Sequence, residues 1–223
     1  MKVNFLKRIT LYCLGLLLLA FGVIFSIKSN LGVSPVSSIP YVLSVITGIE
    51  QGILTIIVFC SYILIQIILL WKDFKVINLF QIIFVIIFGY FITLSSLIWT
   101  FEMPENYFSK VLLLGISVVF IAFGLLFYLT ANIVPQPAEG LMLAIEEKTT
   151  LDFPKIKIIF DCTVVITALI ISIVGTRSLI GIREGTIIAA IAVGKVLSIL
   201  TKKFKPRLVK FIEFEKNRKV YVR

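Results

Sequence analysis

Histidine is absent from this chain of 223 residues, and its absence excludes several classes of enzyme. Ser-His-Asp catalysis, zinc sites of the H-E-x-x-H type and haem ligation by imidazole all require histidine. Histidine is also the usual pH switch near neutrality, so that mechanism is excluded as well. No glycine-rich phosphate-binding pattern occurs, and nucleotide-driven transport by this chain alone has no support in the sequence. We expect a protein that is not an enzyme and that uses neither a cofactor nor a metal.

Cysteine is scarce, and its placement argues against disulfides. Cys13, Cys60 and Cys162 each lie inside an apolar run, and no C-x-x-C spacing occurs. Free cysteines in such surroundings usually behave as small buried hydrophobic residues. The sequence therefore predicts three buried thiols, with no role as metal ligands.

Apolar residues make up 59% of the chain, well above the share found in soluble domains. The runs 10–27 and 111–131 each reach the ~20 residues that a helix needs to cross the hydrocarbon core of a bilayer. A helix satisfies its own backbone hydrogen bonds in lipid. We therefore expect an all-α polytopic membrane protein in contact with the lipid bilayer.

Basic residues outnumber acidic ones by 22 to 12, and nine of them lie within residues 201–223. In a soluble protein this excess would suggest nucleic acid, but cytoplasmic loops of membrane proteins are basic for another reason, the positive-inside rule. We expect no nucleic-acid partner, and both termini on the cytoplasmic side of a bacterial plasma membrane. Residues 202–223 are predicted to form a basic cytoplasmic tail. The tail is either disordered or rests on anionic headgroups with Phe204, Phe211, Ile212 and Phe214 toward the lipid.

The sequence matches itself at an offset of 102 residues, which aligns residues 19–38 with 121–140. Leu and Ile matches are common in any apolar chain, whereas Gly, Asn, Pro and Cys matches at one offset are hard to obtain from composition alone. The matched pairs include Gly22 with Gly124, Asn30 with Asn132, Pro35 with Pro137, and Cys60 with Cys162.

The offset predicts two related repeats, residues 9–100 and 111–201. Each contains a long apolar helix, a short helix that begins at a proline, and two more apolar helices. The expected helices are 9–27, 35–48, 53–71 and 76–99 in the first repeat, and 111–131, 137–148, 156–175 and 185–201 in the second.

The short helices decide how the repeats are inserted. Helix 137–148 measures only ~18 Å at 1.5 Å per residue, and it carries three glutamates, so it is unsuited to span ~30 Å of hydrocarbon. A re-entrant half-helix that starts at its proline fits better. For 35–48 both the re-entrant and the fully spanning alternatives stay open. Three crossings in each repeat would insert the second repeat upside down, which is the inverted-repeat plan of many transporters.

Backbone left open at the two proline segments is expected to form a polar site, because the N-terminus of a helix presents unpaired N–H groups and partial positive charge. The alternative is that the polar side chains here only cap the half-helices or support the backbone. The candidate substrate-binding residues are Asn30, Ser34, Ser37, Ser38, Asn132, Gln136 and Glu139.

Glu139 and Asp161 are candidates for proton coupling, since ionisable groups at membrane depth are costly and often line a path. Asp161 could instead pair with Lys157, one helical turn earlier. Lys195 either snorkels toward the cytoplasmic face or neutralises one of the two carboxylates. Two further features are structural: a predicted surface ion pair between Arg183 and Glu184, and close helix packing at Gly15, Gly22, Gly89, Gly124 and Gly194.

The segments "LGVSPVSSIPYVLS" and "GIREGTIIAAIAVGK" resemble the YczE/YyaS/YitT family of bacterial membrane proteins. Leu31, Gly32, Ser34 and Pro35 carry the first motif, and Gly185, Thr186 and Gly194 carry the second. Lys195 departs from the family pattern, in which proline is common after this glycine. The resemblance implies a membrane protein suspected of transport or export, but it does not indicate which substrate is carried.

These features favour a secondary transporter or permease for a small solute, with its site between the two proline-broken segments. One alternative is the substrate-binding subunit of an energy-coupling vitamin transporter, which would need ATPase partners. Another is a membrane regulator that transports nothing and acts through its basic tail. The substrate and the coupling ion stay open, as does the oligomeric state, for which a homo-oligomer is one alternative.

Overall fold

The computed structural model describes residues 2–151 and 153–213, and within these ranges the fold is all-helical. Six of the helices are long and apolar enough to cross a membrane. The protein is therefore a multi-pass membrane protein, as the hydropathy predicted. The α-helices are α1 (Lys2–Lys28), α2 (Pro35–Thr47), α3 (Gln51–Leu70), α4 (Gln81–Ile98), α5 (Tyr107–Ala131), α6 (Pro137–Lys148), α7 (Phe153–Thr176) and α8 (Glu184–Glu213).

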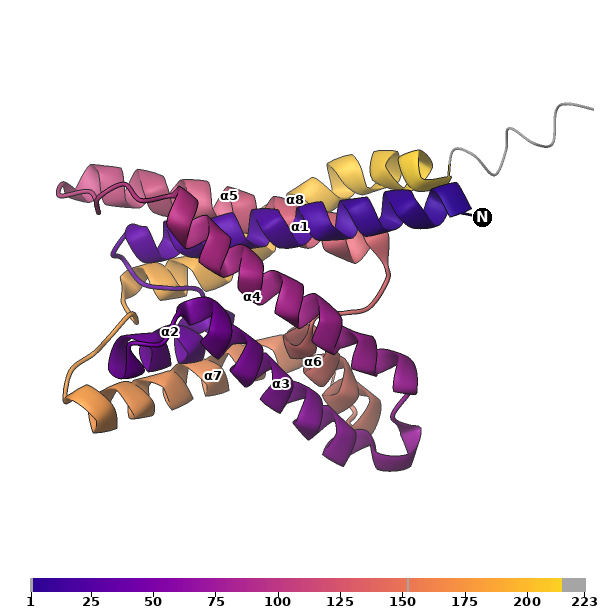
Figure 1. Cartoon of the computed structure of the whole chain (residues 1–223), viewed down its shortest axis with the longest axis horizontal. Helices are drawn as coiled ribbons and strands as arrows, with labels where there is room; N and C mark the ends of the chain where they lie inside the picture. Colours follow the sequence, from indigo (N-terminus) through magenta and orange to yellow (C-terminus); the bar gives the residue numbers. More distant parts are fainter. Residues whose placement is uncertain (1, 152, 214–223) are drawn as a thin grey trace, which may run out of the picture.

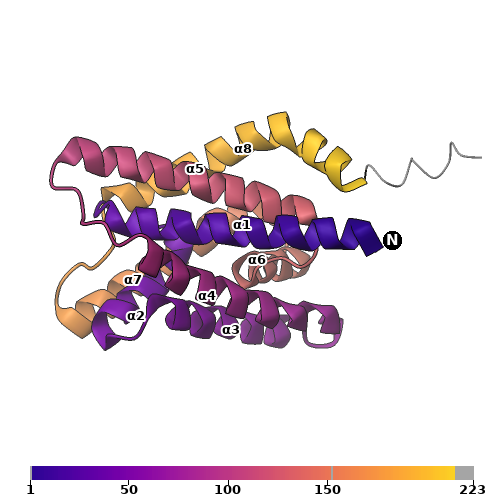
Figure 2. The same cartoon turned by 45° about the horizontal axis from the view of Figure 1, so that its top comes forward.

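In Figure 1 helices α1, α5 and α8 run nearly horizontally, while α3 and α4 run obliquely to them, and the two short helices lie on the same side as α3 and α7. Helices α1 and α5 are antiparallel and pack against each other along most of their length. Helix α8 lies beside α5, while α4 crosses from α1 to α3 (Figures 1 and 2). Each short helix packs against a long helix of the other half: α2 against α7, and α6 against α3.

Glycines allow α1 and α5 to approach closely, as expected for small residues in membrane helices. A Cβ atom at Gly124 would lie 2.7 Å from both the Gly15 carbonyl oxygen and the Leu19 amide nitrogen. A Cβ at Gly22 would lie 2.9 Å from the Ile121 amide nitrogen. Gly89 is packed in the same way against α3. The prediction was wrong for Gly194, where no atom lies within 4 Å of the Cβ position.

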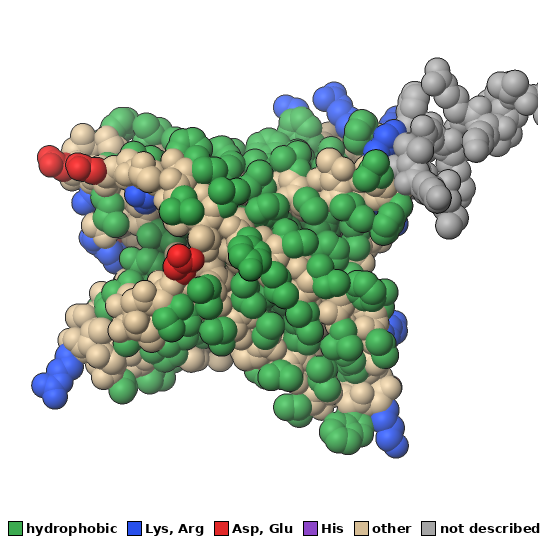
Figure 3. Space-filling model, in the orientation of Figure 1, with side chains coloured by type: hydrophobic (Ala, Val, Ile, Leu, Met, Phe, Trp, Pro, Cys, Tyr) green, Lys and Arg blue, Asp and Glu red, His purple; other side chains and the backbone are tan. Residues whose placement is uncertain are grey.

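Apolar side chains cover the middle of the molecule, whereas charged side chains lie mainly toward its two ends (Figure 3). Many large hydrophobic residues are exposed on α3, α4, α7 and α8, far more than a protein in water tolerates. The same lipid-facing surface explains a wrong prediction about the cysteines. They are free thiols, but Cys162 is exposed and Cys13 and Cys60 are only half-buried, because an apolar helix in a membrane has no need to bury every apolar side chain.

Several helix boundaries differ from the sequence-based prediction, and α1 and α5 begin earlier than expected, at Lys2 and Tyr107 instead of residues 9 and 111. The predicted helix 76–99 begins as a 3-10 helix, η2 (Val76–Phe80), after a first short turn, η1 (Trp71–Asp73). Helix α8 does not end near residue 201 but continues to Glu213, with Pro206 inside it.

The extension of α8 is held by contacts with the rest of the bundle. The Phe204 ring lies 6.0 Å from that of Phe123, and the Lys7 ammonium lies 5.3 Å from the centre of the Phe211 ring. Ile212 is buried, so it packs against the protein instead of facing lipid. Phe214 and the rest of the predicted tail lie outside the described residues.

Candidate functional site

Helices α2 and α6 begin in the same way. Ser34 and Gln136 precede the first helical residue with almost identical extended backbone angles, φ −64° and ψ 148° for Ser34, and φ −66° and ψ 157° for Gln136. A proline follows each of them at the first helical position, where its missing N–H costs no hydrogen bond. Neither Ser34 nor Gln136 caps its helix through the side chain, and in α2 the Ser37 amide donates instead to the Ser34 carbonyl oxygen at 3.0 Å.

Asn30 and Asn132 support the backbone before these openings. Both have left-handed backbone conformations, with φ of 52° and 47°, which asparagine tolerates better than most residues. Both are exposed. Their carbonyl oxygens accept hydrogen bonds from arginines distant in sequence, Arg183 for Asn30 and Arg8 for Asn132. The arginines thus place positive charge at the C-terminal ends of α1 and α5, where the helix dipole favours it.

A cavity of about 120 Å³ lies between the two proline-broken segments. It is level with the middle of the long helices, since Phe59, Phe88 and Ile121 lie near the centres of α3, α4 and α5. The lining residues are Leu19, Val23, Ser34, Val36, Ser37, Phe59, Phe88, Ile121, Leu125, Gln136, Glu139, Lys157, Asp161, Ala190, Val193, Gly194 and Leu197.

Most of this lining consists of residues that correspond between the two halves. Twelve of the lining residues form six pairs at the offset of 102 found in the sequence. The cavity is therefore lined mainly by positions that the sequence offset of 102 relates to each other. The pairs are Leu19 with Ile121, Val23 with Leu125, Ser34 with Gln136, Ser37 with Glu139, Phe59 with Asp161, and Phe88 with Ala190.

Several polar atoms at the cavity are left without partners. Lys157 and Asp161 form an ion pair, with 3.1 Å between Nζ and Oδ2. Asp161 therefore both pairs with the lysine and lines the cavity, while its role in proton coupling stays a prediction. Among the described residues no hydrogen-bond partner is found for Oδ1 of Asp161, Oε2 of Glu139 or Nε2 of Gln136. Buried polar atoms in native proteins are nearly always satisfied, and what distinguishes these three from the other unpartnered buried atoms of the described residues is that all three belong to residues lining one cavity.

Four of the predicted substrate-binding residues, Ser34, Ser37, Gln136 and Glu139, are brought together at the cavity. The other three lie outside its lining. Asn30 and Asn132 occupy the helix ends described above, and the Ser38 hydroxyl donates a hydrogen bond to the Pro35 carbonyl oxygen at 2.6 Å. Lys195 is also outside the lining and is exposed, in agreement with snorkelling and not with neutralisation of a cavity carboxylate.

Sequence reasoning missed two buried glutamines that hold the start of α6. Gln66 donates to the Gln81 side-chain oxygen at 3.2 Å and to the Pro137 carbonyl oxygen at 3.1 Å, and Gln81 donates back to Gln66. Both are 1% exposed. Their signal was present in the sequence, because an amide side chain within an apolar helix is costly in lipid unless it is paired.

The loops next to the openings are pinned at opposite ends of the bundle. At one end, the Gly185 amide donates to the Leu31 carbonyl oxygen at 2.7 Å, and the Val33 amide donates to Gly181 at 2.9 Å. Gly32 has φ of 120° and packs against Thr186, so the two motifs that carry the family resemblance touch each other. The ion pair of Arg183 with Glu184, predicted from the sequence, forms here at 3.4 Å.

At the other end, the N-terminal part of α1 holds the loop that leads into α6. The Arg8 side chain donates to the Ala131 carbonyl oxygen at 2.7 Å, and the Tyr12 hydroxyl donates to that of Val134 at 3.0 Å. The loop before α2 is therefore held by the residues at the start of α8, and the loop before α6 is held by the N-terminal part of α1.

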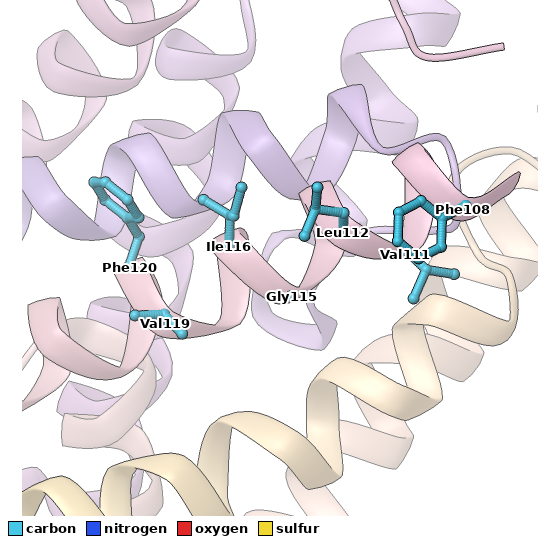
Figure 4. Close-up of a pocket in the computed structure, with 7 residues that line it drawn as sticks. All are labelled: Phe108, Val111, Leu112, Gly115, Ile116, Val119 and Phe120. Atoms are coloured by element: carbon cyan, nitrogen blue, oxygen red, sulfur yellow. The ribbon is translucent and has the colours of Figure 1, made fainter. Parts of the chain in front are cut away.

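A second hollow, on the outer face of α5, has a different character (Figure 4). Every residue that lines it is apolar or glycine, so it suits the hydrocarbon chains of lipid and not a polar solute. The lining residues are Phe108, Val111, Leu112, Gly115, Ile116, Val119 and Phe120.

In a comparison with protein families, residues 6–202 match a family of unknown function, DUF6198. The chain belongs to the DUF6198 family. The DUF6198 region includes both halves and the whole cavity lining. Comparisons with curated proteins and with solved structures gave no match. The resemblance to the YczE/YyaS/YitT family is not tested by the DUF6198 match and stays a prediction.

Proposed function

We propose that this DUF6198 protein is a secondary transporter or permease for a small solute, and that the cavity between the proline-broken segments is its substrate site. The observation that carries the proposal is the set of six lining pairs at one sequence offset. In inverted-repeat transporters, broken helices from both repeats meet at the substrate near the bilayer midplane. A structural scaffold or regulator has no need for matched polar openings at this depth.

The proposal includes an inverted repeat with re-entrant short helices. Support comes from the reciprocal packing of α2 with α7 and of α6 with α3, and from the antiparallel contact of α1 with α5. Gly22 packs against Ser117 and Ile121 in the same way that Gly124 packs against the corresponding Gly15 and Leu19. In Figure 1 the chain turns back toward the centre after α1 and after α5, before each short helix begins.

The pinned loops supply the elements for alternating access. Opening the cavity toward one end would separate the 29–33 loop from the 181–186 loop, whereas opening toward the other would release residues 131–134 from Arg8 and Tyr12. Each set consists of a few hydrogen bonds, and a typical hydrogen bond adds only about 1 kcal/mol to stability. Rocking of one half against the other can therefore exchange one set for the other.

Coupling to protons is part of the proposal. Glu139 and Asp161 face the cavity, and each has an oxygen without a hydrogen-bond partner among the described residues. A charged carboxylate in an apolar site is costly unless it is paired. Binding of a proton or of a substrate would relieve that cost, so the two can compete for the same groups and thereby be coupled.

The orientation we propose places residue 2 and residue 213 on the cytoplasmic side of a bacterial plasma membrane. Six crossings return the chain to the side on which it starts, and the contact of Lys7 with Phe211 joins the two ends. Most basic residues outside the spans then lie inside, as the positive-inside rule requires. Lys28, Lys110, Arg177 and Arg183 are the basic residues left outside.

Uptake into proteoliposomes tests the proposal. Purified protein is reconstituted and screened with a panel of labelled small metabolites, and we expect at least one to accumulate only in vesicles that contain the protein. Glu139→Gln should reduce that uptake at least tenfold, because it removes a charge that contacts the solute. The matched control is Glu147→Gln, which changes an exposed glutamate on the same helix. Normal uptake in both Glu139→Gln and Pro137→Ala would contradict the proposed site.

Accessibility gives a test that needs no substrate. The three native cysteines are replaced and one cysteine is introduced at Ser37. A membrane-impermeant maleimide is then applied from either side of oriented vesicles. Alternating access predicts labelling from both sides over minutes, whereas labelling from one side alone would refute it.

A further inference from the structure

The two halves contribute different chemistry to the cavity although they contribute equivalent positions. The second half supplies every charged lining residue, Glu139, Lys157 and Asp161, together with Gln136. At the positions that correspond to Asp161 and Ala190, the first half supplies Phe59 and Phe88. The cavity therefore has carboxylates from one half and aromatic rings from the other.

The charges of the lining do not balance. Lys157 and Asp161 neutralise each other through their ion pair, which leaves the carboxylate of Glu139 as an excess negative charge when it is ionised. Glu139 lies in the first turn of α6, where the helix dipole stabilises a negative side chain. Burial without a full set of partners penalises that charge, so a ligand with a positive charge would be favoured.

The unpartnered atoms favour the same ligand. Oδ1 of Asp161 and Oε2 of Glu139 have no hydrogen-bond partner among the described residues, although the Tyr128 hydroxyl interacts with the Glu139 carboxylate, and an ammonium group carries several N–H donors that could satisfy these acceptors. Gln136, only 8% exposed, lines the same cavity with a free Nε2. This amide can therefore also donate a hydrogen bond to one acceptor atom of the ligand.

The aromatic rings can hold the rest of such a ligand. Phe59 and Phe88 are 2% and 5% exposed, and they stack with ring centres 6.1 Å apart and an angle of 23° between their planes. The faces of aromatic rings attract ammonium groups and also cover hydrocarbon. The hydrocarbon part of the ligand can pack against these rings while its ammonium group lies at the carboxylates.

We infer that the cavity takes a small organic cation, an ammonium group with a short hydrocarbon chain. The inference rests on the proposed function and names the substrate class of the same site. A cavity of about 120 Å³ is slightly smaller than the 150 Å³ that holds benzene, so it admits about six non-hydrogen atoms. An anion would add to the excess negative charge, and a neutral solute would leave it uncompensated.

Thermal unfolding of the purified full chain in detergent tests the inference with three probes of equal size. n-Butylammonium, 1-butanol and butyrate share one carbon skeleton and differ in charge, and sodium chloride controls for ionic strength. A ligand present at 100 times its Kd raises the Tm of a protein of this size by about 5 °C or more. We expect that rise with n-butylammonium and not with the other two. No rise with n-butylammonium, or an equal rise with butyrate or 1-butanol, would overturn the inference.

Two variants test whether the rise in Tm with n-butylammonium comes from binding at the cavity. Glu139→Gln should weaken n-butylammonium binding at least ~30-fold, since it removes the charge that pairs with the ammonium, and Glu147→Gln should leave binding unchanged. Phe59→Leu keeps an apolar side chain and should weaken binding about 2- to 30-fold through the lost ring. It provides the test if Glu139→Gln fails to fold. A shift that persists in both Glu139→Gln and Phe59→Leu would place binding elsewhere and overturn the inference.

Failure of this inference can be distinguished from failure of the proposed function. Uptake of another solute that depends on Glu139, without any binding of n-butylammonium, would refute the substrate class and leave the transporter in place. Binding of n-butylammonium that depends on Glu139, without uptake of any labelled solute, would keep the cation site and refute transport.

Discussion

Replacing Gly124 by alanine should loosen the central contact between α1 and α5. The added Cβ would lie 2.7 Å from the Gly15 carbonyl oxygen and the Leu19 amide nitrogen, roughly 0.7 Å closer than ordinary van der Waals contact. Both obstacles are backbone atoms of a helix, so they are unable to move aside as a side chain would. One of the two helices must shift.

The size of the effect follows from two opposing terms. Overpacking costs about 1–3 kcal/mol, and we take the upper end because the clash is with backbone. Alanine returns about 1 kcal/mol through its better helix propensity, which leaves a net loss of about 2 kcal/mol. The control is Gly115→Ala on the same helix, where nothing lies within 4 Å of the new Cβ and only the gain of about 1 kcal/mol applies.

Thermal unfolding in detergent measures the difference of about 3 kcal/mol between the two variants. At about 2–4 °C per kcal/mol for a chain of this length, Gly124→Ala should melt about 6–12 °C below Gly115→Ala. Gly22→Ala should behave like Gly124→Ala, because its Cβ would lie 2.9 Å from the Ile121 amide nitrogen. If Gly124→Ala is as stable as Gly115→Ala, the close approach of α1 and α5 is refuted.

Two further predictions concern polar contacts. Gln66→Leu should lower the free energy of unfolding by about 1–3 kcal/mol, because it leaves buried Gln81 without its side-chain partner, and adding Gln81→Leu should recover much of the loss; a double variant less stable than Gln66→Leu would refute the paired role. Lys148→Gln, which breaks the exposed ion pair with Asp73, should change Tm by less than about 2 °C, and a larger fall would mean that this pair holds the 71–80 turn in place.

Much of the fold could be predicted from local sequence. The six spans follow from runs of apolar residues, and the starts of α2 and α6 follow from Pro35 and Pro137, because proline favours the first turn of a helix. Helix α8 was predicted too short, since Pro206 and the lysines around it are typical of a helix end. Its extension depends on contacts with Phe123 and Lys7, which lie far away in the sequence.

The candidate site was only partly predictable. Ser34, Ser37, Gln136 and Glu139 were expected near the openings because they flank the prolines. Lys157 was expected only as a partner for Asp161, and Phe59 and Phe88 were not expected at the cavity at all, because each is one phenylalanine among 19 in an apolar chain.

The sequence by itself indicated the six apolar spans, the self-match at an offset of 102 residues and the prolines at which α2 and α6 begin, because all three depend on local composition, local propensity or self-similarity along the chain. Only the tertiary structure decided which sides of the long helices face inward. In water, polar residues mark the outer side of a helix, but lipid is as apolar as a protein core, so hydrophobic periodicity does not distinguish the two sides of a membrane helix. The meeting of the Glu139 and Asp161 carboxylates with the Phe59 and Phe88 rings at one cavity is therefore a property of the packing alone.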